Sequence, residues 1–375
     1  MKNVKHNIIF IGTPDFSVPT LQALIADERF NVAAVITAPD AKAGRKQIMT
    51  PPPVKTVAKK HGIPVLQPTK LTGRDEAILR LYDELRKLNP DTIVTIAYGQ
   101  ILPETILQIP KYGCLNLHAS LLPKYRGASP IQTAIADGEK ITGVTLMKMD
   151  KEMDTGPVIA QEKIKIIQYC HPERSNACHS DRTTRGSERR NITNIYPSTS
   201  PPAGGFARDD NKSKNGNNLE TGESLHDKLA QLSAKIAVKY IPSYLEKKLK
   251  PKPQDEKEAT YAPKLTRESG KIDWAKPAEE IERLIRAYYP WPGAHTAWNG
   301  KTLKIIKVNL GFKTQINLKE KNHQIGKSFL CDNQLAVQCG DNALIINELQ
   351  LAGGKKMTGK EFLAGHRDII NSILQ

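Results

Sequence analysis

The stretch GCLNLHASLLPKYRG, residues 113–127, decides the fold and introduces the function of this chain. Its first half has the pattern of a buried strand end, and a loop bounded by Pro and Gly follows. Asn116 and His118 are two residues apart, so their side chains leave such a strand on the same face. Ligands of open α/β sheets bind beyond the carboxyl ends of strands. The amide and the imidazole predict a site that holds an oxyanion and moves a proton, the alternative being a polar strand end with a satisfied histidine.

Outward from this stretch, apolar β-branched runs alternate with segments of helical periodicity. This alternation predicts an α/β fold, with a Rossmann-like, mostly parallel sheet and helices on both faces. The expected strands are 8–11, 32–37, 64–67, 91–97, 112–117, 142–149 and 158–167, and the expected helices are 18–26, 54–61, 76–88 and 224–239. The turn Gly12-Thr13-Pro14 lacks the further glycines of a dinucleotide fingerprint, which disfavours a nicotinamide- or flavin-dependent oxidoreductase.

The chain changes character beyond residue 246. A charged, Pro-containing linker is expected at 247–260, and short strands at 294–298, 303–310, 335–339 and 343–350 predict a small, OB-like β-barrel within 261–375. From Lys247 onward there are 22 Lys and Arg against 14 Asp and Glu, and the whole chain carries a net charge of +16. Such an excess favours a polyanionic partner, of which nucleic acid is the commonest.

The first domain, 1–246, contains a composition-biased insert at 168–218. It is rich in Ser, Arg, Asn, Pro and Gly and has almost no aliphatic periodicity, so we predict that it is disordered. Its Cys-His pairs, at 170–171 and 178–179, match no common zinc spacing, and we expect no metal. The five scattered cysteines form no disulfide framework, and no targeting segment or membrane span is recognisable. We therefore expect a cytoplasmic monomer without membrane association.

A basic loop lies between Pro39 and Pro53. It carries Lys42, Arg45 and Lys46 and no acidic residue after Asp40. Loops of this kind on an α/β scaffold often bind ligands, although a solvated connection is an equal alternative.

Several separated motifs resemble the folate-dependent formyltransferases. The two longest are NLHASLLPKYRGASPIQ (116–132) and GVTLMKMDKEMDTGPVI (143–159). Within that superfamily, five further motifs resemble the enzymes that act on methionyl-tRNA: FIGTPDF, AGRK followed by TPPPVK, AYGQILP, IRAYYPWPGA and LQLAGGKKMTG. The resemblance runs from about Ile8 to Gly365 apart from the insert, which those enzymes lack.

The resemblance implies a reaction and a set of residues. The reaction is transfer of the formyl group of 10-formyltetrahydrofolate to the α-amine of initiator methionyl-tRNA, for translation initiation and without a metal. The implied catalytic residues are Asn116, His118 and Asp154. The implied folate contacts are Ser120, Leu121, Leu122 and Pro123, and the implied tRNA contact is Arg45, flanked by Lys42 and Lys46.

Two rival functions remain. A formyltransferase that acts on an amino sugar nucleotide shares the same three catalytic residues, but it has no use for a basic C-terminal half. A non-catalytic tRNA-binding relative, disabled by the insert, keeps the basic surface. The presence of Asn116, His118 and Asp154 argues against this second rival. The position of the insert, which begins close to Asp154 in the sequence, argues for it.

Overall fold

The computed structural model of the protein describes residues 5–44, 47–168, 219–311 and 323–375. Residues 169–218, nearly all of the predicted insert, lie outside these ranges, as do Arg45 and Lys46. Among the described residues, no helix is long and apolar enough to cross a membrane.

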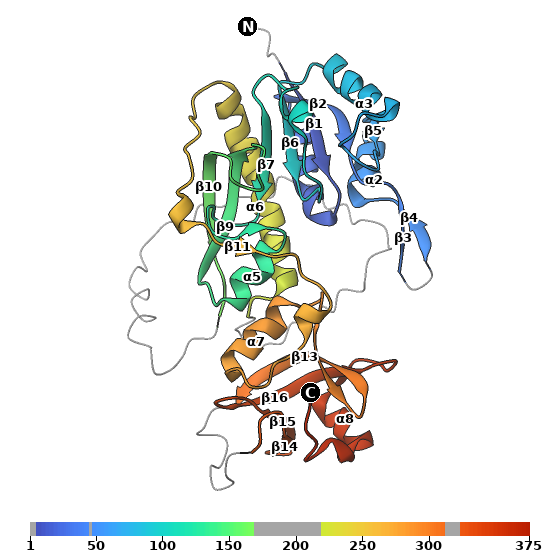
Figure 1. The fold of residues 1–375 in the computed structure, drawn as a ribbon, viewed down its shortest axis with the longest axis vertical. Coiled ribbons are helices and arrows are strands. Elements are labelled where there is room, and N and C mark those ends of the chain that lie inside the picture. Colours follow the sequence, from blue (N-terminus) through green and yellow to red (C-terminus); the bar gives the residue numbers. More distant parts are fainter. Residues whose placement is uncertain (1–4, 45–46, 169–218, 312–322) are drawn as a thin grey trace, which may run out of the picture. The chain divides into compact units, whose positions relative to one another are not determined.

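The first half of the chain forms a seven-stranded, mostly parallel sheet, which confirms the predicted α/β architecture (Figure 1). The strand order is β10-β9-β7-β6-β1-β2-β5. Strands β7, β6, β1, β2 and β5 are parallel, and β9 runs antiparallel to both β7 and β10. The strands are β1 (His6–Gly12), β2 (Phe30–Ile36), β5 (Val65–Leu66), β6 (Thr92–Ile96), β7 (Cys114–His118), β9 (Ile141–Lys148) and β10 (Val158–Lys165).

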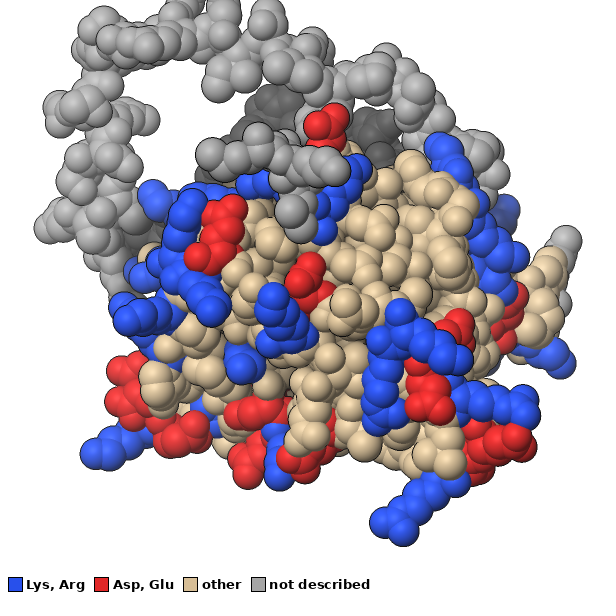
Figure 2. Space-filling model, turned by 90° about the horizontal axis from the view of Figure 1, so that it is seen from above, with Lys and Arg blue, Asp and Glu red and all other residues tan. Residues whose placement is uncertain are grey.

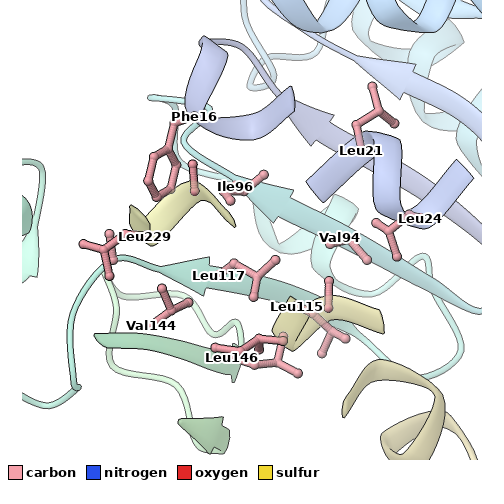
Figure 3. Packing of buried hydrophobic residues seen from close by; sticks show 14 of the residues in the cluster. Phe16, Leu21, Leu24, Val94, Ile96, Leu115, Leu117, Val144, Leu146 and Leu229 are labelled. Atoms are coloured by element: carbon pink, nitrogen blue, oxygen red, sulfur yellow. The ribbon is translucent and has the colours of Figure 1, made fainter. Parts of the chain in front are cut away.

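Helices cover both faces of this sheet. Because side chains alternate along a strand, Ile8 and Phe10 of β1 enter one core and Ile9 and Ile11 enter the other. The helices that contribute to the first core are α1 (Val18–Ala26), α2 (Pro53–Lys60), α5 (Pro130–Ala136) and α6 (Gly222–Leu245). Those that contribute to the second are α3 (Glu76–Lys87) and α4 (Glu104–Leu107). Figure 3 shows the first core, in which Leu229 packs among strand residues.

Helix α6 is longer at both ends than the predicted 224–239. Thr221 and Ser224 form a reciprocal capping box that starts the helix. At the other end Ile241 and Leu245 are buried in the first core, so apolar burial extends the helix through Pro242. The periodicity that defined the helix was correct, but its apolar face continues beyond the last residue of the predicted range.

The C-terminal half contains a six-stranded antiparallel sheet. Its order is β12-β13-β16-β15-β14, and β17 pairs with β16. The strands are β12 (Ala294–Trp298), β13 (Lys301–Gly311), β14 (Ser328–Cys331), β15 (Gln334–Gln338), β16 (Ala343–Leu351) and β17 (Met357–Thr358). Two helices, α7 (Ala278–Ala287) and α8 (Gly359–Gly365), pack into the core of this half.

The predicted barrel is not closed by strand pairing. Among the described residues, the end strands β12 and β14 do not pair with each other. The C-terminal residues bind near both instead: Ala297 and Gln375 exchange two backbone hydrogen bonds, and Leu374 N–H donates to the Gly326 carbonyl. A chain end fills the position of a closing strand, which strand periodicity alone cannot reveal.

Two segments that we expected to be irregular are paired. The basic loop contains a hairpin of β3 (Ala41–Ala43) and β4 (Ile48–Thr50), which projects from the sheet in Figure 1. Within the expected linker, Lys252 pairs with Val158. Directly after the linker, β11 (Tyr261–Ala262) pairs in parallel with β8 (Arg126–Gly127). We call residues 252–262 the strap.

Truncation of Leu229 tests the packing of α6 on the sheet. The side chain is fully buried, so Leu229→Ala should lower the free energy of unfolding by about 2–5 kcal/mol through lost burial and a residual cavity. Urea titration followed by circular dichroism measures the change. Gln231→Ala, at an exposed position of the same helix, is the control, and equal effects of the two substitutions would contradict the assigned packing.

Candidate functional site

A cavity of about 640 Å³ lies at the carboxyl edge of the parallel strands. Its walls come from the turn after β1, the loop after β6 and the end of β7, in agreement with the place where α/β sheets bind ligands. This volume suits a small organic molecule. Within the described ranges, no group of three His, Cys, Asp or Glu side chains is placed to hold a metal ion.

Strand β7 presents Asn116 and His118 to this cavity. Leu115 and Leu117, the alternate residues, are buried in the first core (Figure 3). The period of the strand therefore directs the polar pair to the opposite face. His118 is 7% exposed and Asn116 is half-buried. The prediction that the two side chains share one face is confirmed.

Asp154 lies between Asn116 and His118. Its Oδ1 is 3.5 Å from Asn116 Nδ2, and its Oδ2 is 3.6 Å from His118 Nδ1. The same Oδ2 accepts a hydrogen bond of 2.9 Å from the Gly127 N–H. The turn between β9 and β10 therefore folds back over the sheet and brings a carboxylate to an amide and an imidazole.

The hydrogen bonds of His118 define its tautomer. Nε2 lies 2.9 Å from the carbonyl oxygen of Tyr125, which can only accept a hydrogen bond, so Nε2 carries a hydrogen. In the neutral ring Nδ1 is then the basic nitrogen, and it faces Asp154. This arrangement lets Nδ1 take up a proton and lets the carboxylate stabilise the imidazolium.

The four residues implied as folate contacts do not line the described cavity. Ser120 is fully buried, and its hydroxyl donates to the Lys124 carbonyl. The Leu122 N–H donates to Thr145 Oγ1. Leu121 and Pro123, like these two, follow directly on the cavity wall formed by residues 116–119, and their role stays a prediction.

The basic hairpin is only partly described. Lys42 is exposed on β3, where it pairs with Met49 of β4. Arg45 and Lys46, at the tip, lie outside the described residues.

Three residues that the sequence analysis did not single out form a cluster that contacts the backbone of Asp154. Arg126 is 1% exposed, and its guanidinium binds the side chains of Gln254 and Glu256 in the strap. This contact lowers the pKa of Glu256 below its ordinary value. Arg126 lies inside the motif 116–132, which is a weak sequence signal for a role near the site. The strap residues are about a hundred positions from Asp154, and the sequence gives no signal that they contact it.

Two hydroxyl groups in the cavity wall have no partner among the described residues. They belong to Thr95, which pairs with Asn116 in the sheet, and to Tyr98, and both residues are more than nine-tenths buried. Burial raises the pKa of Tyr98 to about 12, so its hydroxyl keeps its proton and remains a donor at neutral pH.

A matched pair of tyrosines tests this description. Tyr98→Phe removes an unpartnered hydroxyl and should leave the free energy of unfolding unchanged or raise it. Tyr82 is equally buried, but its hydroxyl donates to the Leu71 carbonyl at 2.7 Å, so Tyr82→Phe should cost about 0.5–1.5 kcal/mol. Urea unfolding measures both, and a similar cost for the two substitutions would show that Tyr98 has a partner.

Comparisons with known proteins show the family of the chain. The profile described as formyl transferase matches residues 6–183, and that described as formyl transferase, C-terminal domain, matches 264–367. The chain is 41% identical over 370 residues to the methionyl-tRNA formyltransferase of Halalkalibacterium halodurans, covering 98% of each chain. It is 39% identical over 368 residues to that of Caldanaerobacter subterraneus, covering 98% of this chain and 99% of the relative.

Solved structures share the fold. The N-formyltransferase of Helicobacter canadensis, solved with folinic acid and dTDP-3-aminofucose, superposes with a TM-score of 0.56 at 18% identity, covering 94% of this chain and 100% of that one. HypX of Aquifex aeolicus with tetrahydrofolic acid gives 0.54 at 15% identity, covering 97% of this chain, which spans about half (48%) of HypX. On its family profiles and its curated relatives, the chain belongs to the formyl transferase family and, within it, to the methionyl-tRNA formyltransferases.

Proposed function

We propose that this protein transfers the formyl group of 10-formyltetrahydrofolate to the α-amine of initiator methionyl-tRNA. The observation that carries the proposal is the convergence of Asn116, His118 and Asp154 on one cavity at the carboxyl edge of the sheet. The curated relatives named methionyl-tRNA formyltransferase support the choice of substrates.

The cavity suits a folate on chemical grounds. Its wall combines apolar side chains, Leu102 and Met149 among them, with the unpartnered hydroxyls of Thr95 and Tyr98. A pterin ring offers flat apolar faces and a rim of hydrogen-bonding atoms, so it can use both kinds of wall. The neighbouring residues Ser120, Leu121, Leu122 and Pro123 are the proposed further folate contacts.

The proposed reaction is direct transfer without an acylated side chain. The amine nitrogen attacks the formyl carbon, and the carbonyl oxygen becomes an oxyanion in a tetrahedral intermediate. Asn116 Nδ2 donates a hydrogen bond to that oxyanion. One such donor typically contributes about 3–4 kcal/mol of transition-state stabilisation.

His118 transfers the proton. Its Nδ1 accepts the proton that the attacking amine loses, while Asp154 stabilises the imidazolium. The same proton then passes to the folate nitrogen as the carbon–nitrogen bond to the folate breaks. One bond forms, one breaks, and the proton moves from amine to leaving nitrogen, so the step balances and needs no metal.

Unpaired lysines support a tRNA as the carrier of the amine. Lys301, Lys304 and Lys307 are exposed along β13, and none forms an ion pair with any described residue. They offer phosphate-binding charges on the C-terminal half. On the face shown in Figure 2, Lys and Arg side chains are interspersed with Asp and Glu around a mostly uncharged area.

The rival substrate is an amino sugar nucleotide. The Helicobacter canadensis neighbour was solved with one, but it shares only the fold with this chain. Salt dependence separates the two, because binding of a polyanionic tRNA weakens steeply with ionic strength whereas binding of a sugar nucleotide does not.

A formylation assay tests the catalytic assignment. With 10-formyltetrahydrofolate, the unaltered protein should formylate charged initiator tRNA far faster than charged elongator methionyl-tRNA. Asn116→Ala and Asp154→Ala should still bind folate but lose roughly 100-fold or more in kcat, because each removes a group that acts in the transition state. Asp83→Ala, an exposed position on α3, is the control. Near-normal kcat in either site variant would contradict the assigned roles.

A second prediction concerns the basic hairpin. Arg45→Ala should raise the apparent KM for tRNA much more than the KM for folate, because it removes a charge proposed to contact only the tRNA. Steady-state kinetics with each substrate varied in turn measures the difference, with the exposed Lys87→Ala on α3 as the control. Equal effects on the two KM values would assign Arg45 a structural role instead.

A further inference from the structure

One residue of the strap, Gln254, contacts the turn that carries Asp154. Gln254 Nε2 donates two hydrogen bonds, of 2.8 Å to the backbone carbonyl of Asp154 and of 2.7 Å to that of Gly156. These bonds hold the backbone of the turn on both sides of Thr155. They are the contacts between the strap and the residue that carries the catalytic carboxylate.

Arg126 fixes which way the Gln254 amide faces. Gln254 Oε1 accepts hydrogen bonds from Arg126 Nε at 3.2 Å and from Nη2 at 2.9 Å. A guanidinium only donates, so the amide oxygen must face Arg126 and the amide nitrogen must face the two carbonyls. Glu256, from the same strap, holds the other side of the guanidinium at 2.7 and 2.8 Å.

The backbone of the strap acts on Asp154 from a second direction. The N–H groups of Arg126 and Ala128 donate to the strap carbonyls of Thr260 and Ala262. The intervening Gly127 N–H points the opposite way and donates to Asp154 Oδ2. Gly127 has a φ of +115°, and a Cβ there would lie 2.6 Å from the Ala262 carbonyl oxygen, so the approach requires glycine.

Asp154 needs such support because its own backbone is unfavourable. Its φ is +57°, in the left-handed region that residues with a Cβ seldom adopt. A conformation of this kind persists where the surroundings determine it. The surroundings here are Gln254 on the carbonyl side and Gly127 on the carboxylate.

We propose that Gln254 is a positioning residue for formyl transfer, which acts by holding the turn that aims Asp154 at Asn116 and His118. This inference rests on the proposed function. Gln254 does not line the cavity, so it has no contact with the substrates there. The segment that looks like a linker in the sequence thereby supports the catalytic centre from outside the cavity.

The test uses the full-length protein and the shape-preserving substitution Gln254→Met. We expect kcat for methionyl-tRNA formylation to fall roughly 10- to 100-fold, because a displacement of about 1 Å in a reacting group has costs of this size. The KM values for the formyl donor and the tRNA should change little, whereas the melting temperature should fall because the buried Arg126 loses an acceptor. Gln254→Glu keeps the acceptor for Arg126 but loses both donors, and should show the same loss.

A control variant and a double variant test whether Gln254 acts through Asp154. Asp255→Ala, the neighbouring strap residue whose carboxylate caps only the strap's own Lys257 N–H, should behave as the unaltered protein. In an Asp154→Ala background, Gln254→Met should cause no further loss of kcat, because the two residues act through one group. Equal losses in Asp255→Ala, or additive losses in the double variant, would overturn the inference.

The outcomes also separate this inference from the proposed function. If the unaltered protein formylates no methionyl-tRNA, the proposed function fails. If it does, while Gln254→Met and Gln254→Glu both keep normal kcat, only the positioning role fails.

Discussion

The two-residue period of β7 is the constraint on which the site depends. The side chains of Leu115 and Leu117 belong to the core beneath α1 and α6, so Asn116 and His118 are the polar side chains that the strand presents to the cavity. A shift of one residue in the pairing with β6 or β9 would bury the polar pair and expose the leucines. The hydrophobic effect that stabilises the sheet thus also orients the groups proposed to carry out the chemistry.

The position of Asp154 depends on a different kind of constraint. It lies in a turn, where burial of apolar side chains does not determine the backbone, and hydrogen bonds from Gly127 and Gln254 do so instead. The N–H groups on either side of Gly127, those of Arg126 and Ala128, donate to carbonyls of the strap, and the Gly127 N–H faces Asp154 instead. The catalytic half and the segment leading to the C-terminal half therefore meet at one carboxylate.

These two constraints explain what the sequence could predict. The strand period placed Asn116 and His118 correctly, and helical periodicity identified α1, α2, α3 and most of α6, because both patterns are local. The pairing of β11 with β8 and the contact between Gln254 and Asp154 join residues more than ninety positions apart, and no local pattern reports them. The C-terminal residues beside β12 were missed because their partners are also distant in the sequence. The β3–β4 hairpin is local, but its strands are only three residues long and β4 is exposed, so they show no apolar period.

A crystal structure with 5-formyltetrahydrofolate bound tests the central claim most directly, since it measures where the folate lies relative to the three polar side chains. The account predicts a folate in the cavity between β6 and β7, with the nitrogen from which transfer occurs beside His118 Nδ1 and Asp154 and space for an oxyanion within hydrogen-bond distance of Asn116 Nδ2. A folate bound elsewhere, with Asn116 and His118 out of reach, would contradict it.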